Sequence, residues 1–180
     1  MGTHIALLRG INVGGRNKVA MKDLAALFGD LVCEDVRTYI QSGNVVFRAE
    51  ARLTKRISAV VVDAIEDKWG FRVPVVLRTA AEVLAMSSSN PFLEAGADER
   101  ELHVAFLADT PAADCVTELD PGRFPPDELT VRGREIYLRC PNGMARTKLT
   151  NDYCDRKLGT ISTLRNWKTV LRLAELAAGG

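Results

Sequence analysis

The chain has 180 residues, of which 47% are hydrophobic and 26% are charged, and its formal net charge at pH 7 is +1. This length and composition predict a globular protein of one ordinary domain or two small ones, with enough apolar side chains for a core. They exclude a membrane-spanning helix, since no apolar run is long enough, and Arg9 interrupts the only early apolar run that could act as a signal peptide.

The first half of the chain predicts the element order β-α-β-β-α-β. Apolar residues follow strand or helix periodicity in successive segments, and a Ser42-Gly43 turn separates the second and third strands. The segments are a strand over His4–Arg9, a helix over Met21–Gly29, strands over Val36–Gln41 and Asn44–Arg48, a helix over Thr54–Trp69 with Thr54 as N-cap and Gly70 as C-cap, and a strand over Phe71–Arg78. This order is typical of a split βαβ unit of the ferredoxin-like, or α/β-plait, type.

The second half predicts the same order, followed by a terminal helix. The segments are a strand over Glu101–Leu107, a helix over Ala112–Leu119, a hairpin over Glu128–Arg132 and Glu135–Cys140, a helix over Met144–Leu158 with Gly159 as cap, a strand over Thr160–Leu164 and a helix over Asn166–Ala178. The predicted fold class is therefore α+β with two ferredoxin-like halves, over residues 1–79 and 101–180, joined by a linker or covering segment over residues 80–100.

Two aromatic residues of the first sheet, Tyr39 and Phe47, are expected on the face opposite the helices. Aromatic side chains on an open sheet can stack nucleic-acid bases. The Gly-aromatic pattern of RNA-binding sheets is absent, however, so packing of this face against the second half or a partner chain is the favoured interpretation.

The candidate site is a loop rich in glycine and basic residues that follows the first strand, here called the glycine-rich loop (residues 9–18). Glycine permits a close backbone approach, and N–H groups near a helix N-terminus can bind an anion. Because the first and second strands run in the same direction, this loop should lie beside the turn of the first hairpin. The candidate ligand-binding residues here are Arg9, Asn12, Gly14, Gly15, Arg16, Lys18, Gln41, Ser42 and Asn44. The alternative is a tight connection in which Asn and Gly only make turns.

A second candidate cluster lies in the last third of the chain, which is strongly basic between Arg132 and Arg172. The ends of the third and fourth strands of the second half should bring two segments together, and their basic side chains could clamp a phosphate or carboxylate while a tryptophan stacks a ring or cation. The candidate residues are Arg146, Lys148, Arg165, Asn166 and Trp167. The alternatives are solvated surface charges and a tryptophan in the core.

No catalytic residue can be assigned from the sequence. The Walker, dinucleotide-binding and serine-elbow motifs are absent, and both histidines, His4 and His103, fall within strand patterns, which favours structural roles. Four cysteines form no C-x-x-C pair and have no histidine at metal-ligand spacing. We therefore expect reduced thiols, no metal site, and a cytoplasmic protein without a membrane partner.

Three stretches resemble a bacterial family called domain of unknown function 1697. They are LLRGINVGG at residues 7–15, TYIQSGNVVF at residues 38–47 and TLRNWKTV at residues 163–170, where the family pattern would place Thr at the position of Leu164. The resemblance covers nearly the whole chain and implies two α/β-plait halves. It implies no activity, and no cofactor is indicated.

The leading hypothesis is a binding protein for a phosphate-bearing ligand, either a nucleotide or a nucleic acid, with the glycine-rich loop as its site. One alternative is an enzyme acting on a small anionic metabolite, in which the loops would supply electrostatic stabilisation. The other is a structural module whose polar loops build an interface, for example that of a homodimer. The sequence leaves all three open.

Overall fold

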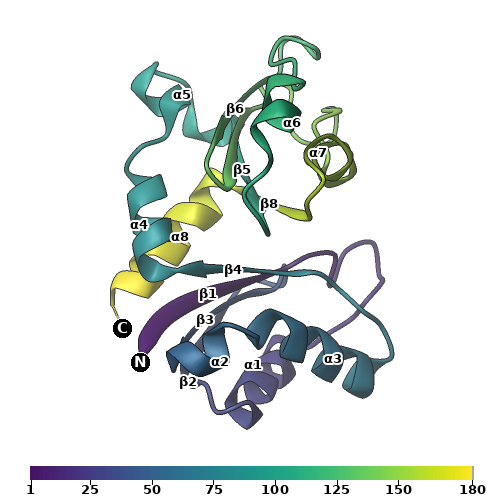
Figure 1. The fold of residues 1–180 in the computed structure, drawn as a ribbon, viewed down its shortest axis with the longest axis vertical. Helices are drawn as coiled ribbons and strands as arrows, with labels where there is room; N and C mark the ends of the chain where they lie inside the picture. Colours follow the sequence, from purple (N-terminus) through teal and green to yellow (C-terminus); the bar gives the residue numbers. More distant parts are fainter. Residues whose placement is uncertain (180) are drawn as a thin grey trace. The chain divides into compact units, whose positions relative to one another are not determined.

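The computed structural model describes residues 1–179 as an α+β chain with two four-stranded antiparallel sheets (Figure 1). The chain forms two compact units. The first contains Met1–Ala85 and the C-terminal segment from Arg172, and the second contains Met86–Leu171. Among the described residues, no helix has the length and apolar character needed to cross a membrane.

The first unit contains a sheet with the strand order β2-β3-β1-β4. Its elements are β1 (Gly2–Leu8), α1 (Met21–Asp30), β2 (Glu34–Tyr39), β3 (Asn44–Ala49), α2 (Ala51–Thr54), α3 (Ile57–Trp69), β4 (Val75–Thr79) and the start of α4 (Ala80–Ser87). The central strand β1 pairs antiparallel with both β3 and β4. It is apolar throughout from Ile5 to Leu8, as expected for a strand with neighbours on both sides.

The second unit repeats this arrangement, with the strand order β6-β7-β5-β8. Its elements are α5 (Pro91–Glu94), the 3₁₀ helix η1 (Glu99–Glu101), β5 (Leu102–Leu107), α6 (Ala113–Thr117), β6 (Glu128–Arg132), β7 (Glu135–Arg139), α7 (Asn151–Leu158), β8 (Ser162–Asn166) and the start of α8 (Trp167–Ala178). The element order predicted for each half agrees with these strands and main helices, and each unit also contains shorter helices outside the predicted order.

The core of the first unit lies between its sheet and helices α1 and α3. Phe28 of α1 packs against Phe47 of β3 with ring centroids 5.1 Å apart, and Val61 and Ile65 of α3 belong to the same buried cluster. The expectation that Phe47 faces away from the helices is therefore wrong. Its neighbour Val46 points the other way, because side chains alternate along a strand, and Phe47 cannot stack a base.

Two helices, α3 and α7, begin several residues later than predicted. Thr54 is not an N-cap but the last residue of α2, and its hydroxyl donates to the Glu50 carbonyl. In the second unit α7 begins only after Thr150, whose hydroxyl accepts a hydrogen bond from the Tyr153 N–H at 3.2 Å. This cap stops the helix from extending back toward Met144, where the chain forms turns instead.

The turn between β2 and β3 is joined directly to the end of β1. The Leu8 N–H donates to the Gly43 carbonyl at 2.8 Å. Gly43 has a φ of +77°, and a Cβ atom there would lie 2.7 Å from Leu8 Cβ and 2.9 Å from Ile11 Cδ1. Only glycine fits this position, both because of its left-handed backbone and because the space is already filled.

Replacing Gly43 by alanine should therefore destabilise the first unit by about 2–5 kcal/mol, through backbone strain together with overpacking. Gly70 is the matched control, since it has the same φ of +77° as the C-cap of α3 but open space around its Cα. Its alanine variant should cost about 1–2 kcal/mol, from strain alone. Urea denaturation of both variants measures the difference, and equal losses would contradict the steric argument.

Candidate functional site

The glycine-rich loop is held in place by the side chain of Asn12. Asn12 Nδ2 donates to the carbonyls of Val19 and Gln41, both at 2.9 Å, and Oδ1 accepts the Val19 N–H at 2.9 Å. The amide therefore joins the end of the loop to the β2–β3 turn and supports the predicted proximity of these two segments. These hydrogen bonds occupy both amide protons of Asn12 and its amide oxygen. Asn12 therefore supports the loop and is not free to bind a ligand.

Within the loop, residues 13–16 form a miniature hairpin. Val13 and Arg16 pair as an antiparallel bridge, and Gly14 and Gly15 between them both have positive φ, at 57° and 76°. Two successive left-handed residues form the turn that suits the twist of a two-residue hairpin. The Asn12 N–H donates to the Asn17 carbonyl at 3.1 Å, which closes the base of the hairpin.

The tip of this hairpin is exposed and basic. Val13 is 62% exposed, and Arg16 and Lys18 are exposed as well. Within residues 1–179, neither cation makes an ion pair, and the N–H groups of Gly14 and Gly15 donate to no protein acceptor. The tip thus presents two backbone donors and the Arg16 side chain to solvent. Lys18 is exposed just beyond the base of the hairpin, whereas Arg9 is half-buried.

The polar residues of the neighbouring turn mainly support the backbone. Asn44 is fully buried, and its Nδ2 donates to the Tyr39 carbonyl and to Ser42 Oγ, both at 3.0 Å. Gln41 contributes its carbonyl to Asn12, and its side chain is exposed. Of the predicted residues in this region, Gly14, Gly15, Arg16, Lys18 and the Gln41 side chain remain directly available to a ligand.

The predicted C-terminal cluster is divided between two places. Arg146 and Lys148 line a cavity of about 280 Å³ together with Arg123 and Phe124, which were not predicted. Both residues lie in a proline-rich segment, residues 121–126, between α6 and β6. An aromatic residue beside an arginine within that segment is the signal that could have identified this cavity.

The other members of the cluster lie elsewhere. Arg165 sits on β8 next to Leu164, which packs on the helix-covered core, so alternation directs Arg165 to the opposite face of the sheet. Asn166 Oδ1 accepts the Thr169 N–H at 2.8 Å in the first turn of α8. Trp167 is fully buried, as in the core interpretation, and its ring cannot reach a ligand in solvent. Burial also lowers the pKa of Arg165 to about 10, which leaves it charged at neutral pH.

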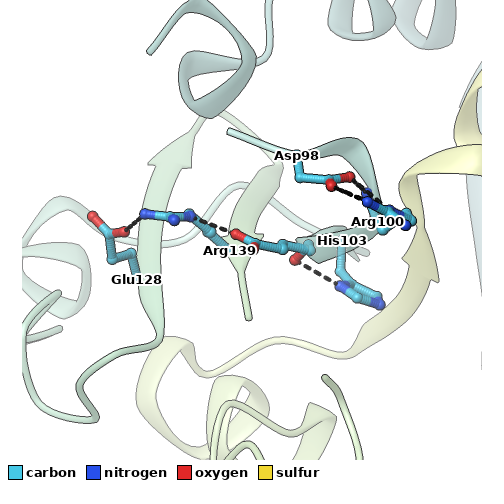
Figure 2. A network of polar contacts seen from close by, with 6 residues as sticks. Asp98, Arg100, His103, Glu128 and Arg139 are labelled. Atoms are coloured by element: carbon cyan, nitrogen blue, oxygen red, sulfur yellow. Dashed lines mark hydrogen bonds and ion pairs between the residues drawn. The ribbon is translucent and has the colours of Figure 1, made fainter. Parts of the chain in front are cut away.

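A polar network at one end of the second sheet is structural (Figure 2). Arg139 of β7 pairs with Glu101 and with Glu128, each at 2.8 Å, and so ties η1 and β6 to β7. His103 Nδ1 lies 3.3 Å from the Glu101 carbonyl, and burial lowers the pKa of its imidazole. The two carboxylates occupy Arg139, and the His103 ring lies against a backbone carbonyl, so these contacts connect η1, β5, β6 and β7 at this end of the sheet.

Two of the four cysteines, Cys33 and Cys140, are buried thiols whose surroundings disfavour the reactive thiolate. Among the described residues, no group of three or more metal-ligating side chains comes together, and all four cysteines are free thiols. Burial raises the pKa of Cys33 and of Cys140 to about 11, so both are protonated at neutral pH. Because a thiolate is the reactive form, these two thiols are inert.

Comparisons with known proteins agree on the fold. The family model described as "Protein of unknown function (DUF1697)" matches residues 1–137, and the chain therefore belongs to the DUF1697 family. A structure of a conserved bacterial protein from Streptococcus pneumoniae is similar, with a TM-score of 0.73 and 22% identity, and 98% of each chain is covered. At this identity the likeness establishes the fold alone. Comparison with curated proteins gives no match.

The scaffold role of Asn12 can be tested with Asn12→Asp, which keeps the shape and the tolerance of a positive φ (55°) but removes the donor. Two carbonyls then face a carboxylate, so we expect a loss of about 1–3 kcal/mol and faster hydrogen exchange of the Val19 amide. Asn17→Asp is the control, because Asn17 Nδ2 donates to only one carbonyl, that of Gly10. Similar losses in both variants would refute the central role of Asn12.

The cysteine assignment predicts a single fast thiol. With a chromogenic disulfide reagent at pH 8, half-buried Cys115 should react first, because a thiol of pKa 11 is only about 0.1% ionised there. The Cys115→Ser variant should lose the fast phase, and unfolding should expose the remaining three thiols. A fast phase that persists in Cys115→Ser would contradict the assignment.

Proposed function

We propose that this DUF1697 protein binds a phosphate-bearing ligand, a nucleotide or a nucleic acid, at the tip of the glycine-rich loop. The proposal rests on one observation: some polar groups of the loop form hydrogen bonds with the backbone, whereas others are exposed to solvent. The side chains of Asn12 and Asn17 donate to backbone carbonyls around the base of the loop, those of Val19, Gln41 and Gly10. The exposed N–H groups of Gly14 and Gly15 and the Arg16 side chain at the tip, with Lys18 just beyond the base, remain available to a ligand.

These leftover groups suit phosphate. Backbone N–H groups on a glycine turn approach phosphate oxygens closely, and adjacent cations neutralise the charge. Because the tip is exposed, a ligand bound there keeps much of its surface in solvent. That situation favours the repeating backbone of a single-stranded nucleic acid over an enclosed mononucleotide, since several phosphates can share one cationic tip.

We infer that each sheet with its covering helices is a ferredoxin-like unit, and the common strand orders β2-β3-β1-β4 and β6-β7-β5-β8 support this inference. We also propose a cytoplasmic location, which four free cysteines favour.

The test is fluorescence anisotropy with short single-stranded RNA and DNA at two salt concentrations. Wild-type affinity should fall as salt rises, and the double variant Arg16→Ala/Lys18→Ala should bind at least about tenfold more weakly with a salt slope smaller by about 1.4. The double variant Lys55→Ala/Arg56→Ala is the matched control, because it removes the same charge from exposed positions outside the loop.

The variants separate local from general electrostatics. Retention of affinity in the control together with loss in the loop variant would support the site. Equal weakening of both variants would indicate nonspecific attraction by net charge, and absence of salt-dependent binding to any oligonucleotide or mononucleotide would overturn the proposal.

A further inference from the structure

The second unit contains a cavity of about 280 Å³, here called the Phe124 pocket. Residues from the segment before β6 and from the segment between β7 and α7 meet in it. The lining side chains with functional groups are Arg123, Phe124, Asp127, Asn142, Arg146 and Lys148.

The charge of the Phe124 pocket is unbalanced. Arg123, Arg146 and Lys148 are exposed, and among residues 1–179 none of them makes an ion pair. Asp127 is the single carboxylate in the lining, so the group carries a net positive charge. Three cations around one small cavity repel one another, and an anion bound among them would relieve that repulsion.

The ring of Phe124 positions two of these cations. Lys148 Nζ lies 5.8 Å and Arg123 Cζ lies 5.6 Å from the ring centroid, both within cation–π range. The ring itself is fixed by an edge contact with Tyr153 of α7, with centroids 5.2 Å apart. Since cations already lie over the ring, Phe124 acts as a support for the charges rather than as a surface for stacking a base.

The other polar groups of the lining indicate what else the anion would carry. Asp127 is 8% exposed and can accept hydrogen bonds from hydroxyl groups, and the Asn142 amide can both accept and donate. A carboxylate would repel a bare anion, but it suits an anion that also carries hydroxyls. The volume of about 280 Å³ lies just below the usual range for small-molecule sites, which limits the occupant to about a phosphate and one sugar ring.

We propose that the Phe124 pocket binds a phosphate monoester of a polyol or ribose, with Arg123, Arg146 and Lys148 holding the phosphate and Asp127 and Asn142 holding hydroxyl groups. Free sugar phosphates and the ribose-phosphate part of a nucleoside monophosphate share this chemistry. Arginine and lysine are the residues that bind phosphate oxygens through charge-assisted hydrogen bonds.

The test is isothermal titration calorimetry of the full chain with four probes: ribose 5-phosphate, adenosine 5′-monophosphate, inorganic phosphate and ribose. Ribose 5-phosphate should bind more tightly than inorganic phosphate, and ribose should not bind. The double variant Arg146→Ala/Lys148→Ala should bind ribose 5-phosphate at least about tenfold more weakly, because two of three phosphate-binding cations are lost. The relative affinities of ribose 5-phosphate and adenosine 5′-monophosphate show whether the pocket prefers a free sugar phosphate or a nucleoside monophosphate. Either preference agrees with recognition of a ribose phosphate.

The Asp127→Asn variant separates the two parts of the site. The variant should bind inorganic phosphate more tightly, because a negative charge is removed. The ratio of the affinity for ribose 5-phosphate to that for inorganic phosphate should decrease, because a hydroxyl-binding group is lost. The double variant Lys55→Ala/Arg56→Ala removes the same charge from exposed positions outside both candidate sites, and it should leave ribose 5-phosphate binding unchanged. No binding of any phosphate probe, or binding that the Arg146/Lys148 variant leaves intact, would overturn the proposal.

Discussion

The geometry of the candidate site depends on one side-chain amide. Asn12 joins the glycine-rich loop to the β2–β3 turn by accepting one backbone N–H and donating to two carbonyls. The backbone segments on either side have left-handed residues that need this support, including Ile40 at a φ of 48° and Asn12 itself at 55°. Because a short polar side chain satisfies the backbone where no sheet hydrogen bond can, the loop has a defined shape before any ligand arrives.

That constraint explains why the tip, rather than the whole loop, is the functional candidate. Side chains at the base form hydrogen bonds to the backbone, and the missing side chain of Gly43 leaves room for Leu8 and Ile11, so that the turn can approach β1. Beyond the base, the miniature hairpin of residues 13–16 carries one cation, Arg16, which makes no ion pair among the described residues. Because hydrogen bonds hold the base in one conformation, an anion that binds at the tip does not have to order the loop. The entropic cost of binding is therefore small.

Sequence reasoning succeeded where the signal is local or follows from strand direction. Periodicity and glycine positions identified the eight strands and the long helices, and the parallel course of β1 and β2 correctly placed residues 9–18 beside the hairpin turn. It failed where the role of a side chain depends on contacts with residues that are distant in the sequence. Nothing local distinguishes Asn12 as a scaffold from Asn12 as a ligand, and a shift of one residue along β8 decides that Leu164 faces the core while Arg165 faces away. Phe124 was missed because its role arises from a lysine and a tyrosine that are more than twenty residues distant in sequence.

The most direct test of the central claim is an amide chemical-shift titration of the isotopically labelled chain with a short single-stranded oligoribonucleotide. If the tip binds phosphate, the backbone amides of Gly14 and Gly15 should move first and saturate together, because they would donate to phosphate oxygens. The Val19 amide, which already donates to Asn12, should move little. Saturable shifts confined to other parts of the chain, with Gly14 and Gly15 unmoved, would contradict the account.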